Sequence, residues 1–131
     1  MIYLDTSAAA KALIEEEGSA DVRRAFTDGT EFIASRLLAV ELHAVADRRK
    51  LSHEAVDDLL DRVALVSLDD ETMDRAVRAH SGLRALGSLH LATAIELTDL
   101  LAGVLTYDDE LANAAVARGL ALVDASGGGA R

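Results

Sequence analysis

The hydrophobic positions of this chain form short apolar runs that alternate with longer amphipathic stretches. The apolar runs have the length and composition of buried strands, and they occupy residues 1–5, 31–35, 64–68, 103–108 and 120–125. Apolar residues three or four positions apart predict helices over 6–18, 19–29, 36–50, 52–63, 69–80, 88–100 and 109–119. This alternation predicts an α/β fold in which helices cover both faces of a parallel or mostly parallel sheet.

The composition indicates one domain with an aliphatic core. The chain has 131 residues, of which 50% are hydrophobic, and it contains two Tyr, two Phe and no Trp. This length is sufficient to bury a core within a single domain, which we assign to residues 1–125. The end of the chain, residues 126–131, is rich in Gly and is predicted to form a flexible tail.

No segment of the sequence resembles a membrane span or a secretion signal. No run approaches the roughly 18 uninterrupted apolar residues that a membrane span requires, and the N-terminal stretch reaches the acid Asp5 too early for a signal peptide. The absence of Cys excludes disulfides and thiolate metal sites. We therefore expect a cytoplasmic protein.

The net charge of −10 limits the kinds of partner that the chain can have. A protein that coats nucleic acid without specificity would be basic, because phosphate contacts dominate its affinity. The acidic balance permits instead a carboxylate site that holds cations, or a basic partner protein. The local basic run at 48–50 is interpreted as a solvated helix end that the helix dipole favours, rather than as a phosphate-binding patch.

Two acids lie where predicted strands end. Asp5 ends the first strand and Asp108 ends the fourth, and ligands of open α/β sheets bind beyond the carboxyl ends of the strands. Each acid also precedes a predicted helix, so N-capping and the helix dipole could explain both of them. Taken singly, capping is the favoured interpretation of each.

Glu41 has no such simple explanation. Its neighbours three and four positions away are all apolar: Leu37, Leu38, Ala44 and Val45. A carboxylate on such a face is costly to bury unless it meets a cation or several hydrogen-bond donors, and no basic residue lies within a turn. We therefore favour a functional role for Glu41 over a structural ion pair.

Three acids from three distant segments are thus expected to converge at one edge of the sheet. Such a cluster repels itself and requires a divalent cation, and oxygen ligands without Cys or His indicate Mg²⁺ or Mn²⁺. An ion of this kind can lower the pKa of a bound water and stabilise charge on a phosphoryl oxygen. Metal-assisted hydrolysis of a phosphodiester is the chemistry that this set of residues favours.

Four segments of the sequence form a specific combination: MIYLDTSA at the N-terminus, LLAVEL around Glu41, LRALGSLHLATA at 83–94 and VLTYDDELANAA at 104–115. Together they resemble the PIN domain, and specifically the VapC-type toxin ribonucleases of bacterial toxin–antitoxin pairs. The resemblance implies a PIN-like three-layer α/β/α sandwich with a central, mostly parallel sheet. It also implies an Mg²⁺- or Mn²⁺-dependent endoribonuclease that cuts structured RNA such as tRNA or ribosomal RNA, forms a homodimer and is neutralised by a cognate antitoxin.

The resemblance also implies which residues form the site. By position, Asp5, Glu41 and Asp108 would be the catalytic, metal-binding acids, with Asp109 as a less favoured substitute for Asp108. Thr6 would help to orient the site and Thr106 would contact it from the end of the fourth strand. Both hydroxyls could equally be ordinary capping groups.

The sequence departs from the family pattern at Gly87, where the family has an Asp that is a principal metal ligand. We expect Gly87 to occupy the N-cap of the following helix, where Gly is only a few tenths of a kcal/mol worse than Asp. The remaining acids could still hold one Mg²⁺, which commonly uses one or two carboxylates and several waters. The departure is compatible with a weakened enzyme, or with a catalytically inactive PIN-fold protein that binds RNA or an antitoxin.

Other polar residues near the predicted site have more ordinary interpretations. Ser88 is expected to cap the helix, and His90 to be a buried supporting histidine rather than a metal ligand. Arg36 and Arg84 could contact phosphate, but surface ion pairs explain them equally well.

Two further explanations of the acids stay open. A phosphatase or a phospho-accepting signalling domain would share the strand-end acids and Mg²⁺, although LDTS at 4–7 lacks the second acid that haloacid-dehalogenase-like phosphatases have two residues after the first. A purely structural explanation would make the aspartates helix caps and Glu41 half of a buried ion pair.

Overall fold

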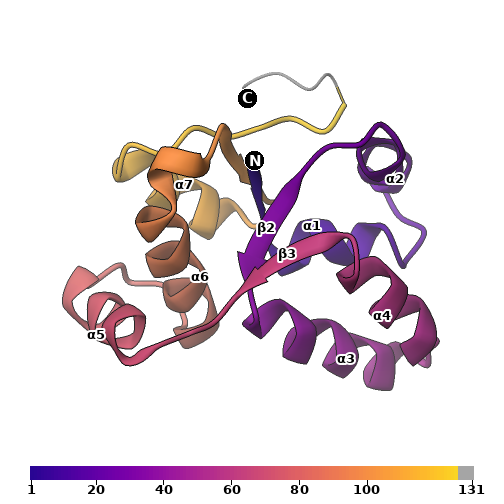
Figure 1. The fold of residues 1–131 in the computed structure, drawn as a ribbon, viewed down its shortest axis with the longest axis horizontal. Helices are drawn as coiled ribbons and strands as arrows, with labels where there is room; N and C mark the ends of the chain where they lie inside the picture. Colours follow the sequence, from indigo (N-terminus) through magenta and orange to yellow (C-terminus); the bar gives the residue numbers. More distant parts are fainter. Residues whose placement is uncertain (127–131) are drawn as a thin grey trace.

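Four parallel strands form the central layer of the computed structural model, which describes residues 1–126 (Figure 1). Their order across the sheet is β3-β2-β1-β4. Their bounds are β1 Ile2–Leu4, β2 Phe32–Ser35, β3 Val63–Val66 and β4 Gly103–Leu105. All three pairings are parallel, so the carboxyl ends of the strands meet at one edge, as the sequence predicts. The expected tail, apart from Ser126, lies outside the described residues.

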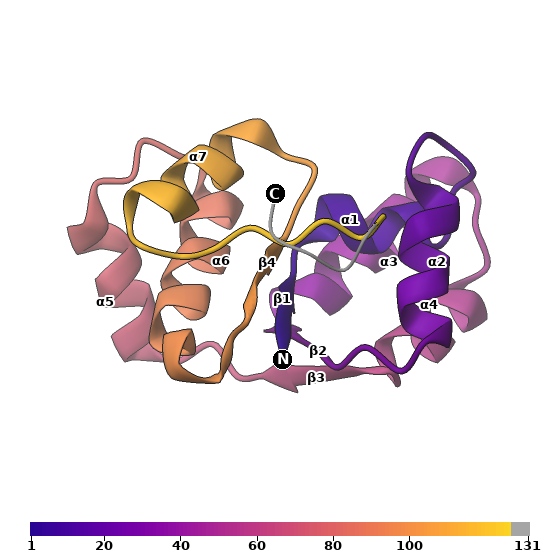
Figure 2. The ribbon, with the colours of Figure 1, turned by 90° about the horizontal axis from the view of Figure 1, so that it is seen from above.

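Helices cover both faces of this sheet and complete the three layers (Figure 2). One face carries α1 Thr6–Lys11, α2 Ser19–Thr27, α3 Leu37–Arg49 and α4 His53–Leu60. The other carries α5 Asp70–Ala79, α6 Ala85–Glu96 and α7 Asp109–Ala117, with a short 3₁₀ turn at Thr98–Leu100. Within residues 1–126, no helix is long and apolar enough to cross a membrane.

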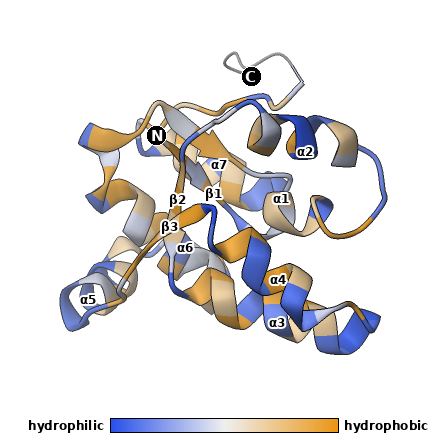
Figure 3. Ribbon diagram, turned by 45° about the vertical axis from the view of Figure 1, so that its right-hand side comes forward, coloured by the Kyte–Doolittle hydropathy of each residue, from blue (hydrophilic) through white to orange (hydrophobic). Residues whose placement is uncertain are grey.

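The sheet divides the core into two hydrophobic clusters because successive strand residues point to opposite faces. In β1, Leu4 packs into the cluster with α1, α3 and α4, whereas Tyr3 packs into the cluster with α6 and α7. In β2, Phe32 packs into the same cluster as Leu4, and Ile33 packs into the same cluster as Tyr3. The outer helices α2 and α5 are largely hydrophilic (Figure 3), which agrees with their position at the surface.

The first helix is shorter than predicted. It was expected over 6–18 but ends at Lys11, and the acidic stretch that follows forms turns up to Gly18, whose φ is +90°. Ser19 stabilises these turns: its Oγ donates to the Ile14 carbonyl at 2.6 Å and accepts from the Glu16 amide at 2.9 Å. The hydroxyl therefore competes with helical hydrogen bonding in this segment.

The fifth predicted strand, at 120–125, is reduced to bridge residues at Leu122 and Val123, of which Leu122 pairs in parallel with Val104. Two backbone hydrogen bonds join this segment to β4, both of them to Val104. The approach is so close that a Cβ on Gly103 would lie 2.8 Å from Val123 Cγ2 and 2.9 Å from the Ala121 carbonyl oxygen. This close approach of the two segments favours Gly at position 103.

Helix α6 begins at Ala85, earlier than predicted, and Arg84 is its N-cap residue. Gly87 is consequently the third residue of the helix, and the prediction that it occupies the N-cap is wrong. The prediction that Ser88 caps the helix is also wrong, because its Oγ donates to the Leu83 carbonyl at 3.2 Å and lies 3.0 Å from Ser81 Oγ. These contacts join the loop before α6 to the first turn of the helix, and the helix begins at Ala85 rather than at residue 88.

Candidate active site

A cleft of about 690 Å³ opens at the carboxyl edge of the sheet. Its walls come from the segment after β1, from α3, from the start of α6 and from the start of α7. The predicted acids Asp5, Glu41 and Asp108 all line it, together with Thr6 and Gly87. The fold thus brings residues from four distant segments into one hollow, as the topology of the parallel sheet requires.

Asp5 does not act as a helix cap. It occupies the N-cap position of α1 but makes no capping hydrogen bond through its side chain. Its Oδ2 instead accepts two hydrogen bonds of 2.7 Å, from Ser7 Oγ and from Thr106 Oγ1. The side chain is 6% exposed, so these two hydroxyls fix a buried carboxylate that faces the cleft.

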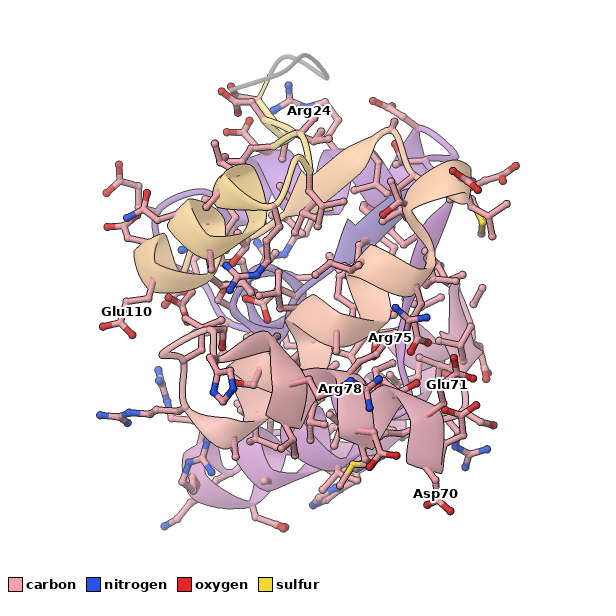
Figure 4. The ribbon with its side chains drawn as sticks, turned by 90° about the vertical axis from the view of Figure 1, so that its left-hand side faces the viewer. Arg24, Asp70, Glu71, Arg75, Arg78 and Glu110 are labelled. Atoms are coloured by element: carbon pink, nitrogen blue, oxygen red, sulfur yellow. The ribbon has the colours of Figure 1, made fainter. Side chains whose placement is uncertain are left out.

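Asp108 is the N-cap of α7, as the capping interpretation of this acid predicts. Its Oδ1 accepts from the backbone amides of Glu110 at 2.9 Å and Leu111 at 3.2 Å. Asp108 Oδ2 makes no hydrogen bond with the described residues. Asp109 and Glu110 are exposed at the rim of the cleft, and Figure 4 shows Glu110 pointing away from the body of the protein.

Glu41 has a partner that its own helix could not reveal. Its Oε1 lies 2.5 Å from Nε2 of His90 on α6, and His90 is 2% exposed. His90 Nδ1 in turn lies 2.7 Å from the Tyr3 hydroxyl, which accepts a hydrogen bond of 3.2 Å from the Ser35 amide. Three buried groups from three elements therefore hold the glutamate in place.

The hydrogen-bond partners of His90 determine which of its ring nitrogens carries the proton. A carboxylate can only accept, so we place the imidazole proton on Nε2, and Nδ1 then accepts from the phenol of Tyr3. Burial raises the pKa of the Tyr3 phenol well above its ordinary value, so the phenol keeps the proton that it donates. His90 is thus a supporting residue of Glu41, as the sequence suggests.

Two supporting hydroxyls complete the first layer around the acids. Thr6 Oγ1 lies 3.4 Å from His90 Nε2, on the side where His90 meets Glu41. Ser7 was not predicted as a site residue, although its hydroxyl donates to Asp5 and lies 3.2 Å from Thr106 Oγ1. Its place in LDTS, two residues after the acid, offered the only hint of this role.

Comparison with known proteins agrees with this architecture. A sequence model of the PIN domain matches residues 2–117. The chain belongs to the PIN-domain family. Curated relatives include Ribonuclease VapC46 of Mycobacterium tuberculosis, 33% identical over 129 residues that cover 93% of this chain and 95% of the relative. Ribonuclease VapC47 of the same species is 33% identical over 138 residues, which cover both chains completely. These relatives place this PIN domain among the VapC ribonucleases.

Solved structures confirm the three-layer fold of this PIN domain. The crystal structure of Mycobacterium tuberculosis VapC20, described as a toxin that cleaves the sarcin–ricin loop, superposes with a TM-score of 0.70 at 14% identity and covers 92% of this chain and 96% of its own. A toxin–antitoxin complex from Klebsiella pneumoniae gives a TM-score of 0.64 at 16% identity, with coverages of 82% and 87%. At these identities the similarity concerns the fold alone.

The carboxylates of this PIN domain suit a hard divalent cation. Among the described residues, hydrogen bonds engage only one oxygen each of Asp5, Glu41 and Asp108, and no Lys or Arg forms an ion pair with them. Within residues 1–126, however, no three acidic or His side chains lie close enough together to enclose a metal ion. The set therefore fits an ion such as Mg²⁺ that takes one or two carboxylates and keeps several waters.

Gly87 faces this cleft from the first turn of α6, and nothing in the local backbone requires a glycine there. A Cβ at this position would meet only the Leu83 side chain, at 3.4 and 3.7 Å, which is ordinary van der Waals contact. No acid occupies the first turn of α6, where the helix dipole favours negative charge. The Cβ of an aspartate would therefore fit this position without movement of the backbone.

Proposed function

We propose that this PIN domain is the toxin of a type II toxin–antitoxin pair and acts as an endoribonuclease that depends on Mg²⁺ or Mn²⁺. The observation that carries the proposal is the cleft itself. Three carboxylates from separate segments line it, each with an oxygen that makes no hydrogen bond within the described chain. His90 contacts Glu41, and no Lys or Arg of residues 1–126 forms an ion pair with any of the three. A divalent cation would offset the repulsion among these carboxylates.

Each acid has a distinct supporting environment for this chemistry. Asp5, Glu41 and Asp108 would hold the cation, which lowers the pKa of a bound water and stabilises charge on phosphate oxygens. Ser7 and Thr106 fix the orientation of Asp5, while His90 fixes that of Glu41. Because these supporting hydrogen bonds are buried or partly buried, Asp5 and Glu41 should keep their positions when the substrate enters the cleft.

The expected substrates and partners follow from the relatives. The VapC20 neighbour cleaves the sarcin–ricin loop, and the Klebsiella neighbour is a complex of a toxin with its antitoxin. We infer for this chain a structured RNA substrate, tRNA or ribosomal RNA, and a cognate antitoxin. The net charge of −10 suits an antitoxin segment that is basic. We further infer that the toxin is a homodimer.

A second candidate function rests on Gly87. A PIN domain without the carboxylate at this position could bind RNA or an antitoxin and have little or no catalytic activity. Membership of the PIN family removes the reason to consider a phosphatase or a phospho-accepting domain. The hydrogen bonds of Asp5 to two hydroxyls also argue against a purely structural role as a cap, although Asp108 does cap α7.

One experiment separates the two candidates. Binding of Mg²⁺ and Mn²⁺ is measured by calorimetry on this chain and on Gly87→Asp, and both are tested for cleavage of tRNA and ribosomal RNA, with Gly87→Asn as the uncharged control. If this chain binds the metal and cleaves RNA, and Gly87→Asp increases both, it is a weakened enzyme. If only Gly87→Asp binds the metal and cleaves RNA, this chain is a PIN domain with little or no catalytic activity, which is the second candidate. If neither variant cleaves RNA, the nuclease proposal is wrong.

A further inference from the structure

A second hollow, of about 390 Å³, adjoins the catalytic cleft. Its lining includes Lys11, Val45, Arg48, Arg49 and Tyr107, and we name it the Arg48–Arg49 groove. Ser7 lines both hollows. Its Oγ donates to Asp5 and accepts from the Tyr107 amide at 2.9 Å. The groove therefore begins where the acidic cleft ends.

The two arginines bring positive charge to a protein that is otherwise acidic. The chain has 13 Lys and Arg against 23 Asp and Glu. Arg48 and Arg49 are exposed and form no ion pair within residues 1–126. Lys11, in contrast, is already held by Glu16 and by the Glu17 carbonyl. The arginines are thus the basic groups that are available to a ligand in this groove.

The arginines continue the stripe of α3 that carries Glu41. Positions 41, 45, 48 and 49 lie at i, i+4, i+7 and i+8, so they share one side of the helix. At 1.5 Å per residue, the arginines follow Glu41 by about 10–12 Å. A stacked nucleic-acid strand advances about 3.4 Å per nucleotide, so this span corresponds to about three nucleotides. The arginines therefore lie at a distance from Glu41 that a short single strand of RNA can span.

We propose that the Arg48–Arg49 groove holds the phosphates of a single-stranded RNA segment that flanks the cleavage point. The proposal rests on the proposed nuclease function. Tyr107 lines the groove beside the arginines: it is 39% exposed, and Lys11 Nζ lies 4.5 Å from the centre of its ring. Aromatic rings next to basic side chains are the usual platform for single strands. The basic run at 48–50, interpreted from the sequence as a solvated helix end, thus acquires a role in binding.

The test compares two double variants with the same change in charge. Arg48→Gln with Arg49→Gln alters the groove, whereas Arg62→Gln with Arg78→Gln alters arginines that line neither hollow; Arg78 lies on α5 beside Arg75 (Figure 4). Anisotropy of a labelled single-stranded RNA of ten nucleotides, without metal and over a series of salt concentrations, gives the affinity. We expect the groove variant to bind about tenfold more weakly and to lose about 1.4 from the salt slope, since each phosphate contact contributes about 0.7.

Cleavage kinetics in the Gly87→Asp background distinguish a failure of the groove from a failure of the nuclease. The proposal predicts that the groove variant raises KM for an RNA with a flanking single strand and leaves kcat unchanged, because neither arginine contacts the acids. Equal losses of affinity in both double variants would overturn it, as would unchanged KM and salt slope. If the groove variant instead loses binding of a glutamate-rich peptide but not of RNA, the groove takes an acidic protein segment. If no variant cleaves RNA, the proposed function itself is wrong.

Discussion

We expect Tyr3→Phe to destabilise this PIN domain strongly, although the substitution removes a single oxygen atom. The Tyr3 side chain is fully buried, and its hydroxyl accepts from the Ser35 amide and donates to His90 Nδ1. Phenylalanine fills the same space but leaves both of these groups without a partner. Each buried polar group that loses its hydrogen bond costs about 1–3 kcal/mol, so the loss of two should lower the free energy of unfolding by about 2–6 kcal/mol.

The same substitution should also affect Glu41. Without the phenol, the proton of His90 can move to Nδ1, and Nε2 then loses the hydrogen that it now donates to the carboxylate at 2.5 Å. We therefore expect a lower kcat for RNA cleavage even at temperatures where the variant is fully folded. A His90→Gln variant, whose amide can still donate to Glu41, should retain more activity than His90→Leu, which cannot.

Urea unfolding followed by circular dichroism measures the stability change, and cleavage is measured in the Gly87→Asp background. Val77→Ala is the control, because Val77 is 73% exposed and lines neither hollow, and surface substitutions usually change stability by less than about 0.5 kcal/mol. A Tyr3→Phe protein within about 0.5 kcal/mol of the wild type, with unchanged kcat, would refute both the hydrogen-bond assignment and the role of His90.

Two further predictions concern the scaffold. Hydrogen bonds from the backbone amide and hydroxyl of Thr72 lower the pKa of the Asp69 carboxyl, so its stabilising effect is present above the unfolded-state pKa and is lost as pH falls through the lower folded value. Asp69→Ala should lower Tm at pH 7 and flatten the dependence of Tm on pH below about pH 4; an unchanged acid slope in thermal melts would contradict the assignment. Gly103→Ala should cost about 1–3 kcal/mol, because its Cβ would lie 2.8 Å from Val123 Cγ2 and 2.9 Å from the Ala121 carbonyl. Urea denaturation checks this prediction. An unchanged free energy of unfolding would show that the segment at 120–125 moves aside for the added methyl group at little cost.

The sequence predicts those features that depend on local patterns. The alternation of apolar runs and amphipathic stretches was sufficient for the order of strands and helices, and parallel pairing then brought Asp5 and Asp108 to one edge of the sheet. Glu41 was recognised because a carboxylate among apolar neighbours needs a partner. The four motifs added what no local pattern could, namely the membership of the PIN family.

Features that depend on contacts between distant segments could not be predicted. His90 and Glu41 are 49 residues apart, so no periodicity could identify the histidine as the partner of the glutamate. The same holds for Thr106 and Asp5, which are 101 residues apart. The start of α6 was misplaced because Gly87 suggests a cap locally, whereas the hydroxyls of Ser81 and Ser88 join the loop to the helix from outside the apolar pattern.

Because Gly87 lies within the first turn of α6, a substitution there changes the free energy of unfolding through several contributions that different variants can separate. Alanine there should add about 0.5–1 kcal/mol, because Gly is unfavourable inside a helix, and a negative charge at the N-terminus adds about 0.3–1 kcal/mol. Repulsion from the carboxylates of Asp5, Glu41 and Asp108 opposes the second term. Gly87→Ala isolates the first contribution, and comparison of Gly87→Asn with Gly87→Asp isolates the charge.

A bound cation would turn the repulsion between an aspartate at position 87 and the other acids into a net attraction through the ion. It would leave the contribution of helix propensity unchanged. Without metal, Gly87→Asp should therefore be less stable than Gly87→Asn, because the added charge joins three carboxylates with which no Lys or Arg of residues 1–126 forms an ion pair. With Mg²⁺ present, binding to the folded state stabilises it by RT ln(1 + [Mg²⁺]/Kd), and the order of the two variants should invert. Such an inversion requires that the ion bind next to position 87. The stability of the variants at position 87 thus reports on the metal site independently of any RNA substrate.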